Sequence, residues 1–139
     1  MAYRLPTAIC LALTVPAAPS GGQEGRPAIG GTLTVVPELA RHVEASDRLI
    51  IKLYHPGAGV ELDAKYPIVP KFALPLAFHV APSVDMSGQT KFDAYVIEIF
   101  TDKDDDVLRV APGELVARTL EPVPLGTLDL RLELDATRQ

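Results

Sequence analysis

The sequence predicts an all-β protein, an immunoglobulin-like sandwich of two sheets with about six to seven short strands and one short helical turn. Apolar and polar residues alternate with a period of two along several short segments, which is typical of strands with one buried face. The 139 residues also include 13 prolines and 10 glycines, which interrupt helices and mark turns. With 47% hydrophobic and 22% charged residues, the chain has the composition of a globular domain with a core.

The alternation places the elements along the chain. The clearest segment lies near the C-terminus, where Leu128, Leu130, Leu132 and Leu134 are expected to face the core and charged residues stand between them. Pro37 suits the first position of a helix, which predicts a short helical turn over residues 37–43. The strands are predicted at residues 30–36, 48–55, 74–80, 93–101, 114–123 and 128–135.

Two of these segments carry further expectations. In the strand at 93–101, Glu98 predicts that the face it shares with Val96 and Phe100 is partly in contact with water. The segment 66–80 contains three prolines, which cannot donate backbone hydrogen bonds to a neighbouring strand. We therefore expect an edge strand or an extended crossing there, followed by the strand at 74–80.

The N-terminal residues have the layout of a secretory signal peptide. Residues 1–20 begin with one basic residue, Arg4, continue with a mostly apolar run from Leu5 to Val15, and end in small residues and prolines. The run is shorter than the roughly 20 residues of a membrane-spanning helix. We predict a cleaved leader, a periplasmic location and no transmembrane span in the mature chain, with a disordered apolar tail as the alternative. Residues 21–28 are expected to be a flexible lead-in, and 29–137 a single sandwich domain.

Composition excludes several classes of function. Cys10 is the one cysteine, and loss of the leader would leave none for disulfides, thiolate nucleophiles, cysteine-ligated metals or covalent haem attachment. The net charge of -5 argues against nucleic acid as a partner. No phosphate-binding glycine loop or cofactor motif is present, so we expect no cofactor.

Candidate catalytic residues are equally scarce. No serine stands in the sequence context of an activated nucleophile. A pair of carboxylates that act together as in glycosidases stays open as a third hypothesis, because sequence alone does not show which acids converge.

A metal site is the main alternative from another class. Asp102, Asp104 and Asp106 alternate as the first ligands of a calcium loop do, but Val107 and Gly113 occupy the positions where an EF-hand needs glycine and glutamate. A solvated loop is the simpler interpretation, with weak, millimolar-range calcium binding as its alternative. Because histidine and methionine suit copper, the full candidate set for a copper or calcium protein is His79, Met86, Asp102, Asp104 and Asp106.

Four phrases of the chain together resemble a known family. They are IGGTLTVVPELARHVEASDRLIIKLYHPG at residues 29–57, FALPLAFHV at 72–80, VDMSG at 84–88 and PGEL at 112–115. They are similar to the periplasmic C-terminal domain of the cytochrome c-type biogenesis protein CcmI/CycH. The resemblance implies a non-enzymatic, exported β-sandwich that holds unfolded apocytochrome c for haem attachment. The chain departs from the family in having no membrane helices and no TPR-like region, so its partner is expected to be apocytochrome c or a component of a maturation or redox complex.

The partner polypeptide is expected to bind at an edge strand within residues 66–80. Open strand edges pair readily with an added strand. The alternative is that the prolines of this segment protect the edge against such pairing. The expected contact residues are Lys52, Tyr54, Tyr66, Phe72 and Phe78.

Overall fold

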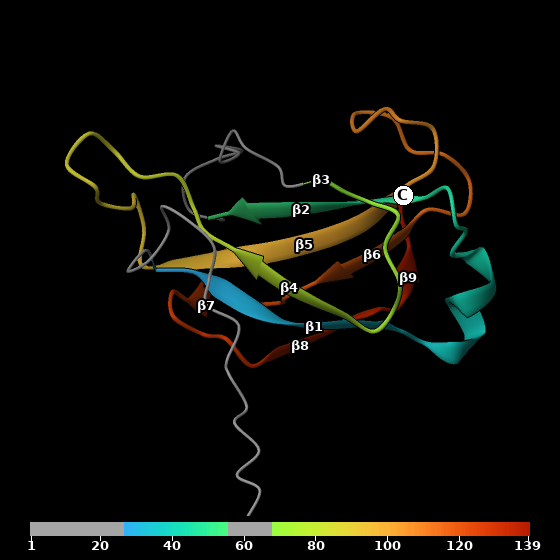
Figure 1. Ribbon diagram of the computed structural model, residues 1–139, viewed down its shortest axis with the longest axis horizontal. Coiled ribbons are helices and arrows are strands. Elements are labelled where there is room, and N and C mark those ends of the chain that lie inside the picture. Colours follow the sequence, from blue (N-terminus) through green and yellow to red (C-terminus); the bar gives the residue numbers. More distant parts are fainter. Residues whose placement is uncertain (1–26, 56–67) are drawn as a thin grey trace, which may run out of the picture.

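The protein is described here from a computed structural model, which describes residues 27–55 and 68–139. These residues form two β-sheets packed face to face and one helical turn (Figure 1). The predicted all-β sandwich is confirmed. The predicted signal peptide, Tyr66 and most of the predicted lead-in lie outside the described residues. No helix in the described part of the chain is long and apolar enough to cross a membrane.

The strands are short and follow one another with few helical residues between them. The 3-10 helix η1 (Pro37–His42) stands at the predicted place and begins with the expected proline. The strands are β1 (Ile29–Val35), β2 (Arg48–Tyr54), β3 (Ile68–Pro70), β4 (Leu76–Val80), β5 (Ala94–Asp102), β6 (Leu115–Arg118), β7 (Val123–Pro124), β8 (Leu130–Leu134) and β9 (Ala136–Thr137).

The described residues contain nine strands, more than the six to seven predicted for the chain. The additional ones are β7 and β9, with two residues each, whereas β3, with three residues, lies in the segment 66–80 where an edge strand or crossing was expected. Such lengths are too short for an alternation of apolar and polar residues to be recognised.

The strands form a small sheet and a large sheet. The small sheet has the order β4-β1-β8, and the large sheet has the order β3-β2-β5-β6-β9, with β7 beside β5. Strand β1 pairs with β4 in the antiparallel sense and with β8 in the parallel sense. All named pairs within the large sheet are antiparallel.

The core lies between the two sheets. The longer strands contribute alternate side chains to it, as the pleat of a strand requires. Leu39 and Val43 of the η1 turn pack against its margin. The buried members of the core are Ile29, Leu33, Leu49, Ile51, Leu53, Phe78, Val80, Tyr95, Ile97, Ile99, Leu115, Ala117, Leu132 and Leu134.

The chain crosses between the sheets on both sides of the sandwich. On one side, residues 71–75 lead from β3 in the large sheet to β4 in the small sheet, and Leu74–Pro75 is a cis peptide bond. On the other side, Asp135 links β8 to β9, and its backbone N–H donates to the Val116 carbonyl at 3.3 Å. The proline-rich segment therefore provides both an edge strand and a crossing.

Leu128 was predicted to face the core, and this prediction is wrong. Its side chain is 61% exposed, because β8 begins only at Leu130. At that point β8 passes close to β1: a Cβ atom added to Gly31 would lie 1.9 Å from the Leu130 carbonyl oxygen. Glycine at position 31 is therefore required by the close approach of the two backbones.

The outer face of β5 is drier than predicted. Val96 and Phe100 are buried, and Glu98 alone of the predicted face is half-buried. The Phe100 ring is covered by two cations, with Lys52 Nζ 4.9 Å and the Arg138 guanidinium carbon 3.9 Å from the ring centre. Long basic side chains thus exclude water from an aromatic residue on the outside of the large sheet.

Candidate functional site

A polar network lies at the end of the sandwich where β5 leaves the large sheet. It contains three buried carboxylates, Asp47, Asp102 and Glu114, each of which is at most 1% exposed. A buried carboxylate destabilises the fold unless a cation and hydrogen bonds compensate for its lost hydration. Each of the three has such a partner.

Asp102 is paired with Arg48, its register partner on β2. The Arg48 Nε donates to Asp102 Oδ2 at 3.0 Å, and Nη2 forms an ion pair with the same oxygen. The hydrogen bond to Asp102 raises the pKa of Arg48 above its ordinary value. The pair therefore fastens the end of β5 to the start of β2.

Lys103 joins the η1 turn to this network. Its Nζ donates to Asp47 Oδ2 at 2.8 Å and to the His42 carbonyl at 2.6 Å. Its backbone N–H donates to Glu114 Oε1 at 3.1 Å. Lys103 thus compensates two buried carboxylates, Asp47 before β2 and Glu114 before β6.

Arg138 pins the β5–β6 loop, residues 103–114, from the C-terminal end of the chain. Its Nη1 donates to Glu114 Oε2 at 2.9 Å and to the Arg109 carbonyl at 3.2 Å, and its Nη2 donates to the Val107 carbonyl at 3.2 Å. Ala28 and Arg138 are both packed into the fold, just outside the boundaries of 29–137 predicted for the domain.

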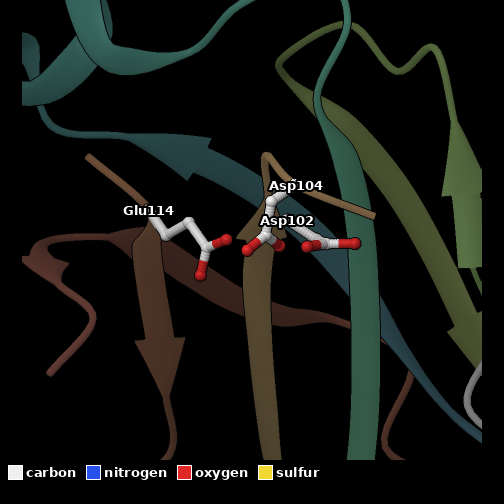
Figure 2. A group of neighbouring side chains, drawn as sticks. All are labelled: Asp102, Asp104 and Glu114. Carbon is white, nitrogen blue, oxygen red and sulfur yellow. The ribbon is translucent and has the colours of Figure 1, made fainter. Parts of the chain in front are cut away.

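Three carboxylates of the network converge at the base of this loop (Figure 2). One oxygen each of Asp102, Asp104 and Glu114 lies within 4.8 Å of the others. The structure therefore brings together two of the predicted calcium ligands. Asp106 is not in this group, and its Oδ1 instead accepts the backbone N–H of Leu108 at 3.0 Å.

Glu114 was not among the predicted metal ligands. It follows Gly113, which occupies the position of the last EF-hand ligand in the sequence comparison. It directly precedes Leu115, the buried first residue of β6. Its place before an apolar strand start is no signal of burial, because Asp129 stands in the same position before Leu130 of β8 and is exposed. The cation that compensates Glu114, Arg138, lies 24 residues further along the chain.

His79 and Met86 do not join the carboxylates. His79 is exposed on β4 of the small sheet, and Met86 is fully exposed between β4 and β5. In the described residues, no group of three histidine, cysteine or acidic side chains close enough to hold a metal contains His79. The copper set of the sequence prediction is therefore spread over separate parts of the fold.

The predicted partner-binding residues also lie apart. Phe78 is 7% exposed and belongs to the core, because β4 directs its ring between the sheets, and Phe72 of the crossing segment is partly buried against the core. Lys52 and Tyr54 are half-buried on the large sheet, where the Arg118 guanidinium lies 5.1 Å from the Tyr54 ring centre. Burial raises the pKa of Tyr54. In the part of the chain that the structure describes, Lys52 and Tyr54 therefore share one face of β2, whereas Phe72 and Phe78 pack at the core and do not join them.

The small sheet presents a different surface. Strand β4 has a hydrogen-bonded neighbour on one side only among the described residues, namely β1. The exposed side chains of β4 are Ala77 and His79. Next to them, an open depression of about 460 Å³ is lined by Thr32, Thr34, Arg131 and Glu133 of β1 and β8.

Comparison of the chain with protein-family models, with curated proteins and with solved structures finds no match in any of the three.

Proposed function

We propose that this protein is a non-enzymatic, exported binding module, which assists c-type cytochrome maturation or the assembly of a periplasmic redox complex by binding a partner polypeptide. The resemblance of residues 29–57, 72–80, 84–88 and 112–115 to the CcmI/CycH domain supports the choice of partner. The edge at β4, which has no second strand partner among the described residues, supports the mode of binding, and it is the observation on which the proposal depends.

Among the sheet edges, β4 is the least protected. Natural edge strands are kept from pairing by short length, proline, charge or coverage. In the described residues β3 is short and ends in Pro70, β9 has two residues, and β8 carries Arg131 and Glu133. Strand β4 has five residues, LAFHV, without proline or an acidic, lysine or arginine side chain.

The β8 side of the sandwich is further closed by the hydrogen bond from Asp135 to Val116 of β6. A partner strand added at β4 would extend the small sheet through backbone hydrogen bonds, which are independent of the partner's sequence. This mode suits a module that holds an unfolded chain.

The test is a calorimetric titration of the chain with an apocytochrome c and with that cytochrome's isolated C-terminal segment. Ala77→Lys places a charge on the edge strand, and Thr32→Lys places the same charge on the register partner of Ala77, in the middle of the sheet. We expect Ala77→Lys to weaken binding by at least about tenfold, the effect of 1.4 kcal/mol, and Thr32→Lys to bind as the unmodified chain does.

The possible results separate the two parts of the proposal. Failure of both ligands to bind the unmodified chain would reject the maturation role. Binding that Ala77→Lys and Thr32→Lys leave equally strong would retain the role and reject β4 as the binding edge. Thermal unfolding of both variants checks that each is folded.

A further inference from the structure

The carboxylates at the base of the β5–β6 loop have one oxygen that the protein leaves without a partner. Asp102 is fully buried, and both contacts from Arg48 go to its Oδ2. Its Oδ1 is buried and has no hydrogen-bond donor in the described part of the chain. Figure 2 shows one oxygen of Asp102 directed toward Asp104 and Glu114, and the other directed away, toward β2. Because Arg48 lies on β2, the oxygen that faces the other two carboxylates is Oδ1.

An unpaired, buried carboxylate oxygen is unfavourable for the fold. Nearby side chains do not remove this disadvantage, because Asp104 and Glu114 bring further negative charge to the same place. A cation between the three groups would supply what Oδ1 lacks.

The donor set identifies the class of ion. Carboxylate oxygens without histidine or cysteine favour a hard cation over copper or zinc. Calcium binds oxygen at roughly 2.4 Å, so two oxygens on opposite sides of the ion are about 4.8 Å apart, whereas magnesium needs a tighter shell at about 2.1 Å and keeps several waters. The three oxygens lie within 4.8 Å of one another, a separation that one calcium ion can span.

We propose that Asp102, Asp104 and Glu114 form a calcium site that joins the end of β5 to the start of β6 across the intervening loop. The site uses Glu114 in place of Asp106. Arg48 and Arg138 already neutralise two of its ligands, which places its affinity in the weak range of extracellular calcium modules, with a dissociation constant of about 0.1 to 1 mM. The site is independent of the partner-binding function proposed above.

The test uses calorimetry of the full chain with calcium chloride and with magnesium chloride at constant ionic strength. NMR follows the amides of Lys103 and Leu115, which flank two of the ligands. Asp104→Asn removes the charge of the exposed ligand and leaves both buried ion pairs in place. Asp106→Asn is the matched control, because its amide oxygen still accepts the Leu108 N–H.

We expect saturable binding of calcium with movement of both amides, at least tenfold weaker binding in Asp104→Asn, and unchanged binding in Asp106→Asn. Magnesium is expected to bind at least tenfold more weakly than calcium. The proposal is overturned if the unmodified chain shows no saturable binding of calcium up to about 20 mM, well above the affinity range of such sites. It is equally overturned if Asp106→Asn loses as much affinity as Asp104→Asn.

Discussion

The guanidinium carbon of Arg138 lies 3.9 Å from the centre of the Phe100 ring. The same guanidinium pairs with the fully buried Glu114, so a residue next to the C-terminus covers an aromatic ring of the large sheet and compensates a buried charge. Arg138 is therefore part of the folded structure, and its removal should weaken both the cover of Phe100 and the polar network around Glu114.

Arg138→Ala is expected to lower the free energy of unfolding by about 3 kcal/mol, because it leaves Glu114 buried without its cation. Urea denaturation followed by circular dichroism measures the change. Arg109→Ala is the control, since its side chain is 78% exposed and its pair with Asp104 is 3.8 Å long. The control should change stability by less than about 0.5 kcal/mol. Equal effects in the two variants would show that Arg138 does not compensate Glu114.

The two glycines at positions 31 and 88 should respond differently to alanine. Gly31→Ala brings a Cβ into collision with the β8 backbone, which has no flexible side chain to yield, and should destabilise the fold by about 2 to 3 kcal/mol. Gly88 has a positive φ of 84° but open space around it, so Gly88→Ala should destabilise by about 1 kcal/mol through backbone strain alone. Thermal unfolding ranks the two, and the reverse order would contradict the close approach of β1 and β8.

The register of β8 can be checked with two leucines of the same alternating run. Leu134→Ala empties a fully buried position and is expected to lower stability by about 3 kcal/mol. Leu128→Ala removes an exposed side chain and should lower it by less than about 1 kcal/mol. Guanidinium denaturation of both variants provides the comparison. A large loss in Leu128→Ala would mean that β8 begins earlier and turns Leu128 inward.

The stability that the turn at residues 85–89 contributes to the fold should depend on pH. The Ser87 hydroxyl donates to Asp85 Oδ1 at 2.5 Å and the Gln89 N–H donates at 3.0 Å, and these bonds, that of Ser87 first, lower the pKa of Asp85. A carboxyl whose pKa is lowered by folding stabilises the folded form above its ordinary pKa, and this contribution is lost as the pH falls through the lowered value. NMR titration of the Asp85 carboxyl carbon measures this transition.

In Ser87→Ala the pKa of Asp85 is expected to rise toward its ordinary value, because the largest cause of the shift is removed. Ser46→Ala, which changes an exposed serine in another connection, should leave the Asp85 titration as it is. An Asp85 titration that is the same in all three proteins would exclude the Ser87 hydroxyl as the cause.

Most of the sandwich is predictable because its strands bury one face each. The alternation of apolar residues correctly places the long strands β1, β2 and β5, and the proline at position 37 places the η1 turn. Where prediction fails, features that local alternation does not contain decide the outcome. Phe100 is covered by Arg138 rather than by water, and Leu128 is exposed because β8 begins only at Leu130.

The candidate site is predictable only in part for the same reason. Asp102 and Asp104 are close in sequence, and their spacing indicates that they converge. Glu114 reaches them because β5 and β6 are antiparallel neighbours, with Phe100 opposite Val116. The binding surface predicted around Phe78 does not form there, because β4 directs this ring into the core. The direction depends on the register of β4, which composition alone does not reveal.

The parallel pairing of β1 with β8 has a consequence for biosynthesis. The first strand of the domain lies between β4 and β8, and its partners in β8 are about a hundred residues further along the chain. Pairings so distant in sequence slow folding, because a long loop must close before any contact forms. A growing chain on the ribosome therefore has one unpaired side of β1 until residues 130–134 have been made. The small sheet cannot be completed before residues 130–134 are available to pair with β1.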